Sequence, residues 1–190
     1  MTIRLTLLCA AANAEREPRF ADEPLDERAV RQTRAAAAAL PPAGVQYTAP
    51  SQRCRGTAAA LGLDATVDNA LRDIDMGSWQ GRTLDEIASS DTAAFTAWMT
   101  DPEQAPHGGE SVAALCQRVT AWLHDLAAEN GRVLAVVEQS VARAAVVSAL
   151  SAPMSSFWRI DVPPLTAVQL TGRAGRWNLL LGGASAAADG

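Results

Sequence analysis

Glu138 and Asp73 are the residues of this sequence whose types best suit acid–base chemistry. Two carboxylates that share a cleft can act as a general acid and a general base. Because a buried carboxylate needs a partner, Glu138 has a second interpretation, an ion pair in an inactive pocket. Arg53 and Arg143 are its candidate partners, one in the helix expected after the second strand and one in the helix expected after Glu138. We favour the ion pair and leave the choice of arginine open.

Cys9 is the candidate nucleophile, because it ends a predicted strand near the expected position of Arg53. A neighbouring arginine lowers a thiol pKa, whereas Glu138 nearby would raise it. We favour the interpretation that Cys9 is a small buried thiol that fills space. His107 lies in a glycine-rich loop expected to border the same cleft. It could ligate a metal with the carboxylates or the thiol, but these residues are scattered in sequence, so we expect no metal and no cofactor.

Strands that alternate with helices must position these residues. Short apolar strands are predicted at 3–8, 45–48, 65–67 and 132–137, and helices between and after them at 24–40, 50–62, 83–90, 91–98, 111–126 and 140–150. This alternation predicts a three-layer α/β fold, a mostly parallel sheet with helices on both faces. Two late strands, 166–170 and 176–181, are expected to form an antiparallel edge. Ligands of such folds bind outside the carboxyl ends of the strands, where Cys9, Arg53 and Glu138 are expected.

Length and composition limit the remaining possibilities. The 190 residues, 48% of them hydrophobic, suit one domain, for which we expect residues 1–183, with 184–190 as a flexible tail. The net charge of −5 and the absence of a basic stripe argue against nucleic acid and anionic membranes as partners. Three cysteines at no metal-like spacing indicate a reducing, cytoplasmic location. The apolar run before Cys9 is too short for a signal peptide.

Five motifs, in order, resemble the histidine phosphatase (phosphoglycerate mutase-like) superfamily over nearly the full chain. They are residues 7–13 (LLCAAAN), 49–58 (APSQRCRGTA), 71–81 (LRDIDMGSWQG), 107–111 (HGGES) and 136–140 (VVEQS). Each motif alone is weak, but their order and spacing are specific for a phosphoglycerate mutase-like fold. The resemblance implies a phosphatase site in which two histidines and two arginines handle a phosphoryl group.

The same resemblance assigns a role to each matching position. Cys9 replaces the first phosphate arginine, Ala10 replaces the nucleophilic histidine and Glu138 replaces the second histidine. Arg53 matches the second arginine, and Asp73 matches the proton donor, one methylene shorter than the usual glutamate. The expected site therefore comprises Glu138 and Asp73 as vestigial or repurposed catalytic groups, and Cys9, Ala10, Arg53, Asn13, His107 and Arg143 for binding.

These replacements predict that the family chemistry fails. Ala10 has no nucleophilic atom, and removing a nucleophile can cost on the order of 10⁶ in turnover. Cys9 removes a positive charge and Glu138 adds a negative one. Our first hypothesis is a pseudophosphatase with a binding or regulatory role. Its partner would be an unidentified small molecule or a protein, which could be a second copy of this chain. A repurposed enzyme using Glu138 and Asp73 on a substrate without phosphate, or a phosphatase with residual phosphomonoesterase activity, are the alternatives, so enzyme status stays open.

Overall fold

The computed structural model describes residues 2–14, 19–127 and 131–181. The strands are β1 (Ile3–Cys9), β2 (Val45–Thr48), β3 (Thr66–Val67), β4 (Gly131–Val137), β5 (Ala167–Arg173) and β6 (Arg176–Leu180). The α-helices are α1 (Glu27–Ala36), α2 (Gln52–Ala60), α3 (Leu84–Ser90), α4 (Thr92–Thr100), α5 (Val112–Leu126) and α6 (Gln139–Ala149). Short 3₁₀ helices span Ala37–Ala39, Asn69–Leu71, Gly77–Trp79 and Met154–Arg159. The tail expected at 184–190 lies outside the described residues.

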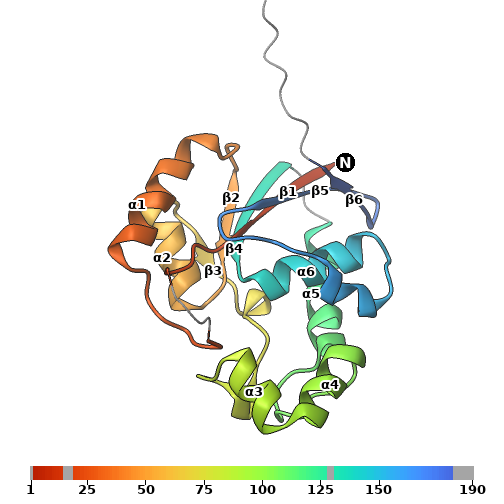
Figure 1. Ribbon diagram of the computed structural model, residues 1–190. Helices are drawn as coiled ribbons and strands as arrows, with labels where there is room; N and C mark the ends of the chain where they lie inside the picture. Colours follow the sequence, from red (N-terminus) through yellow and green to blue (C-terminus); the bar gives the residue numbers. More distant parts are fainter. Residues whose placement is uncertain (1, 15–18, 128–130, 182–190) are drawn as a thin grey trace, which may run out of the picture.

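The six strands form one sheet in the order β3-β2-β4-β1-β5-β6. β3, β2, β4 and β1 are parallel, whereas β5 and β6 are antiparallel to their neighbours. Helices α1 and α2 lie on one side of the sheet, and α5 and α6 lie on the other (Figure 1). The predicted three-layer α/β fold and its antiparallel edge are therefore confirmed.

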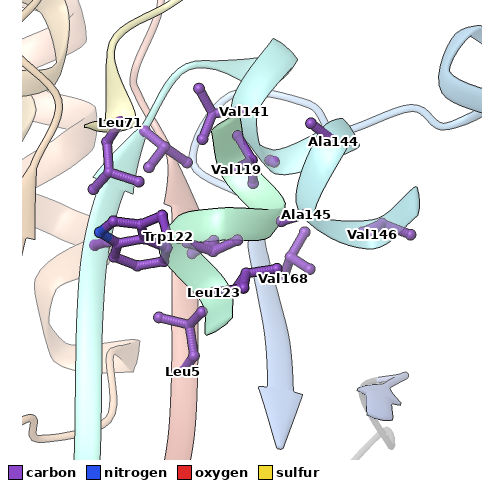
Figure 2. Packing of buried hydrophobic residues seen from close by; sticks show 14 of the residues in the cluster. Leu5, Leu71, Val119, Trp122, Leu123, Val141, Ala144, Ala145, Val146 and Val168 are labelled. Atoms are coloured by element: carbon purple, nitrogen blue, oxygen red, sulfur yellow. The ribbon is translucent and has the colours of Figure 1, made fainter. Parts of the chain in front are cut away.

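The core lies mainly between the sheet and helices α5 and α6. Strands β1 and β4 are almost wholly buried, which explains why both are continuous apolar runs. Helix α5 buries one apolar face, formed by Val112, Leu115, Val119, Trp122 and Leu126. Figure 2 shows Val119, Trp122 and Leu123 packed between the sheet and α6. Burial of this face is the main stabilisation of the helix, because isolated helices of this length are marginal in water.

Helices α3 and α4 lie apart from the sheet, beyond the carboxyl ends of its parallel strands (Figure 1). Thr83 and Glu86 form a capping box at the start of α3. A second apolar cluster of Met76, Trp79, Ile87 and Trp98 holds this part together. Helices α3 and α4, which we call the lobe, are therefore held by their own apolar cluster. The lobe covers the carboxyl ends of the parallel strands, where a ligand is expected. No helix within the described ranges is long and apolar enough to cross a membrane.

Two loops meet backbone to backbone between the sheet and this lobe. A Cβ atom on Gly109 would collide with the carbonyl oxygen of Asp75, and one on Gly77 with the carbonyl oxygen of His107. Gly77 also has a positive φ of 46°. Glycine is required at both positions because only it allows so close an approach. This contact fixes the segment that carries Asp73 against the start of α5.

Candidate functional site

A cleft lies at the carboxyl ends of the parallel strands, under α3 and α4. It consists of two adjoining hollows of about 310 and 250 Å³ that share Arg19, Phe20, Arg53, Asp73, Ile74, Met76 and Glu138. A further hollow of about 450 Å³, at the opposite end of the strands, is lined by Arg4, Thr6, Arg132 and Thr171 among others and by no carboxylate. We assign the functional site to the cleft, because parallel α/β sheets bind ligands at strand carboxyl ends and both predicted carboxylates line it together with Arg53 and Arg143.

Glu138 sits between Arg53 and Ser51 inside the cleft. Nη2 of Arg53 donates to Oε2 of Glu138 at 3.1 Å, and its Nε donates to Oε1 at 3.4 Å. Ser51, the N-cap residue of α2, donates its hydroxyl to Oε1 at 2.7 Å. The Glu138 side chain is only 9% exposed. Both of its oxygens are therefore occupied, as expected of a buried carboxylate that has found its partner.

Arg143 does not contact Glu138, the partner considered for it in the sequence. Its Nε donates to the carbonyl oxygen of Ile160 at 2.6 Å, and its Nη2 lies 3.6 Å from Asp161. Its guanidinium also lies 5.7 Å from the centre of the Phe157 ring. Arg143 lines the cleft but is not the partner of Glu138, because the segment after α6 draws its guanidinium away.

Asp73 lies next to this ion pair, at the junction of the two hollows. Its Oδ1 accepts hydrogen bonds from the Ile74 amide, at 2.8 Å, and from the Ser140 hydroxyl. Burial and, next in size, the negative charge of Glu138 raise the pKa of Asp73 to about 6. Asp73 and Glu138 therefore share the cleft as predicted, and Asp73 can change its protonation state near neutral pH.

Cys9 is the last residue of β1, and Ala10 follows it, hydrogen-bonded to the residue that precedes Glu138. Both are buried, and the amide of Ala10 donates to the carbonyl oxygen of Val137 at 2.8 Å. Burial, followed by the charge of Glu138, raises the pKa of the Cys9 thiol to about 12. A thiol with such a pKa is almost wholly protonated at neutral pH and is a poor nucleophile. The geometry agrees with the favoured interpretation of Cys9 as a space-filling residue.

We expect Cys9 to resist alkylation in the folded protein. All three cysteines are free and buried, and burial is the largest cause raising each pKa. Iodoacetamide at neutral pH should label none of them within an hour-scale incubation, and all three after unfolding in guanidinium chloride. Mass spectrometry of the intact and digested protein measures the labelling. Rapid modification of Cys9 in the folded state would contradict this assignment.

His107 and Asn13 lie outside the cleft, contrary to their predicted roles in binding. His107 is buried behind the aromatic cluster, 5.0 Å from the Trp79 ring, and its Nδ1 accepts from the Gly109 amide at 3.1 Å. The tight glycine loop turns its imidazole inward, and it lines neither hollow of the cleft. Asn13 bridges the Asp26 amide and a neighbouring carbonyl oxygen, which fixes the loop before α1. Across the described residues, no group of side chains could hold a metal ion.

The sequence did not reveal several residues that line the cleft. Ser51 and Ser140 hold the two carboxylates, and Arg19 and Phe20 approach from the segment before α1. One hollow is walled by Trp98 and Trp158, whose rings lie 4.2 Å apart. Ser51 could have been recognised by its N-cap position. The paired tryptophans carried no signal, because they are separated by 60 positions in the sequence.

The profile of the histidine phosphatase superfamily (branch 1) matches residues 10–184. The chain belongs to this superfamily. A solved structure of mycobacterial glucosyl-3-phosphoglycerate phosphatase in complex with VO3 is 27% identical, covers 94% of this chain and 97% of that one, and superimposes with a TM-score of 0.83. The resemblance found in the sequence is thus confirmed for family and fold.

Two curated relatives match smaller parts of the superfamily domain. Glucosyl-3-phosphoglycerate phosphatase of Mycolicibacterium vanbaalenii is 35% identical over 83 residues, which are 42% of this chain and 37% of that protein. Phosphoserine phosphatase 1 of Hydrogenobacter thermophilus is 28% identical over 121 residues, which are 60% of this chain and 57% of that protein. The chain therefore matches less than two thirds of the length of either relative.

Proposed function

We propose that this member of the histidine phosphatase superfamily forms no phosphohistidine and acts by binding a small molecule or a protein, as a pseudophosphatase. The observation that carries the proposal is the ion pair of Arg53 and Glu138, the residue after Val137, whose carbonyl oxygen accepts from the amide of Ala10. A phosphoryl-transfer site needs a nucleophile and positive charge for the phosphoryl oxygens. Here Ala10, directly after β1, offers only a methyl group. The carboxylate of Glu138 already binds Arg53, the arginine that matches the family motif.

Electrostatics also argue against a bound phosphate. Two unit charges about 4 Å apart interact by roughly 4 kcal/mol at an effective dielectric constant of about 20. A dianion beside Arg53 would meet Glu138 at short range, and ionised Asp73 as well. Repulsion from these carboxylates would offset the attraction of one arginine.

The three buried, unpaired thiols additionally fit a reducing compartment such as the cytoplasm.

A repurposed enzyme is the second candidate, and Asp73 is the observation that favours it. A carboxyl group whose pKa is about 6 can donate and accept a proton near neutral pH. This candidate needs Glu138 to be free for proton transfer, whereas Glu138 is bound on both oxygens. Acid–base chemistry would therefore rest on Asp73 alone. Hydrolysis of phosphomonoesters, the activity that the names of the relatives suggest, is the third candidate.

Hydrolysis of a panel of phosphomonoesters tests the proposal. The panel includes p-nitrophenyl phosphate, 3-phosphoglycerate esters and phosphoserine. Protein incubated with a labelled phosphate donor is denatured at alkaline pH, where the N–P bond of phosphohistidine survives, to trap covalent phosphate. We expect neither turnover above the buffer rate nor trapped phosphate. Turnover by the native protein that is lost in Glu138→Gln would show Glu138 to be a working catalytic group, and the proposal would be wrong.

A further inference from the structure

Among the described residues, each arginine that lines the cleft already has a carboxylate partner. Arg53 binds Glu138 at 3.1 Å, as described above. Arg19 lies 3.3 Å from Glu86, at the outer edge of the cleft. Arg143 lies 3.6 Å from Asp161 and donates to a backbone carbonyl oxygen. The positive charges of the lining are therefore largely satisfied before any ligand arrives.

Asp73 differs from the other groups because its partners are neutral. Both of its hydrogen bonds, from Ser140 and from the Ile74 amide, go to Oδ1. Among the residues that the structure describes, none donates a hydrogen bond to Oδ2 of Asp73, and none forms an ion pair with its carboxylate. The side chain is half-buried, and a partly desolvated carboxylate without a counter-charge is unfavourable. The position at the junction of the two hollows leaves room for a ligand to supply that charge.

An apolar and aromatic wall lies beside this carboxylate. The smaller hollow, of about 250 Å³, is lined by Phe20, Ile74, Met76, Trp98, Phe157 and Trp158 in addition to the charged groups. Trp158 is only half-buried, so part of its indole remains accessible from the cleft. Aromatic faces attract cations, and the guanidinium of Arg143 over Phe157 already shows this contact in the wall.

We propose that the cleft binds an organic cation, with its ammonium group against Oδ2 of Asp73 and its apolar or aromatic body against the tryptophan wall. The inference rests on the proposed function, because it takes the cleft to be a non-covalent binding site. A cavity of this size suits a small ligand whose apolar part supplies most of the contact area. The ammonium group would provide the positive charge that the described residues do not give Asp73.

Binding should depend on pH through Asp73. The charged or titratable groups around its carboxylate are Glu138 directly after β4, Arg53 and Cys54 on α2, Cys9 on β1 and Arg143 on α6. Glu138 is held by Arg53, and the thiols of Cys9 and Cys54 stay protonated over the range used. Since the pKa of Asp73 is about 6, lowering the pH from 7.5 to 5 should weaken binding by about tenfold, because the protonated carboxyl no longer attracts a cation.

Four probes that share one body separate the head groups. 2-Phenylethylamine, 2-phenylethanol, 3-phenylpropanoate and 2-phenylethyl phosphate are titrated into the native protein by calorimetry, with tryptophan fluorescence as a second signal from the wall. We expect the amine to bind at least about tenfold more tightly than the alcohol, which corresponds to about 1.4 kcal/mol. The two anions should bind more weakly than the alcohol.

A pair of substitutions ties this preference to one residue. Asp73→Asn keeps an oxygen that can accept from Ser140 and Ile74 but removes the charge. It should abolish the preference for the amine and its pH dependence, while its thermal midpoint stays at or above that of the native protein. Asp125→Asn, on a side chain that is 87% exposed, is the matched control and should change neither.

The outcomes distinguish this inference from the proposed function. An amine that binds no better than the alcohol, or an equal preference in Asp73→Asn, overturns the organic-cation site and leaves the pseudophosphatase proposal standing. Tight binding of the intact phosphate ester also overturns the organic-cation site alone. Hydrolysis of that ester instead overturns the proposed function itself.

Discussion

Replacing Glu138 with glutamine is expected to give the cleft an affinity for inorganic phosphate that the native protein lacks. Glutamine keeps the shape of the side chain and can still accept from Ser51. It removes the negative charge that lies 3.1 Å from the Arg53 guanidinium. Arg53 would then be free to form charge-assisted bonds to a phosphate oxygen, with the amide of Gln as a neutral neighbour.

The expected gain follows from the size of the charge effect. A full charge interaction of roughly 4 kcal/mol must be discounted, because the Arg53 side chain is 25% exposed to solvent. About half of it corresponds to roughly a thirtyfold gain in affinity. Competition of phosphate or vanadate with a fluorescent anion measures it, and the gain should shrink at high salt.

The control separates a local effect from a change in net charge. Glu103→Gln removes the same charge from an exposed side chain away from the cleft and should leave phosphate binding unchanged. Equal phosphate affinity in native protein and Glu138→Gln would show that Glu138 does not block Arg53. The electrostatic argument for a non-catalytic site would then fail, even if no turnover were found.

The sequence predicted the fold and the centre of the cleft for one physical reason. Buried parallel strands are continuous apolar runs, so β1 and β4 were visible as such, and their carboxyl ends share one edge of the sheet. This rule alone predicts that Cys9, Glu138 and Arg53 lie close together, as they do. Asp73 was placed by its motif, and it lies in the same cleft.

Side-chain direction was the part that sequence could not provide. His107 follows a proline and precedes two glycines, but nothing in that pattern shows that the loop turns the imidazole toward Trp79. Arg143 was expected near Glu138, yet its nearest acceptor is the backbone of Ile160, which follows a 3₁₀ segment that the sequence did not predict. Both corrections arise from contacts between residues that are distant in the chain.

An ion pair of Arg118 and Glu110 went unnoticed in the sequence and supports the segment before Asp73. Nη2 and Nε of Arg118 donate to the two carboxylate oxygens of Glu110 at 2.6 and 2.9 Å. Nη1 donates to the carbonyl oxygens of Ala70 and Arg72, at 2.8 and 3.0 Å. The side chains are only 12% and 10% exposed. One guanidinium on α5 therefore fixes the backbone that leads directly into Asp73.

Arg118→Met is expected to be the most destabilising of the substitutions considered. It keeps most of the side-chain volume but leaves a buried carboxylate and two carbonyl oxygens without their donor. Breaking a buried pair on one side typically costs about 3–5 kcal/mol, partly offset here by Arg72, which lies 3.5 Å from Glu110. About 3 kcal/mol would lower the melting temperature of a domain of this size by roughly 10 °C, measured by circular dichroism.

An exposed ion pair on α1 serves as the control for the loss of stability expected in Arg118→Met. Arg31 and Glu27 form an i,i+4 pair at 3.6 Å, with side chains 67% and 96% exposed, and such pairs contribute little. Arg31→Met should therefore leave the melting temperature almost unchanged. If Arg118→Met were equally silent, the network would not stabilise the fold. If it lowers stability as expected, the fraction that stays folded should also bind the amine probe more weakly, because the backbone that positions Asp73 has lost its support.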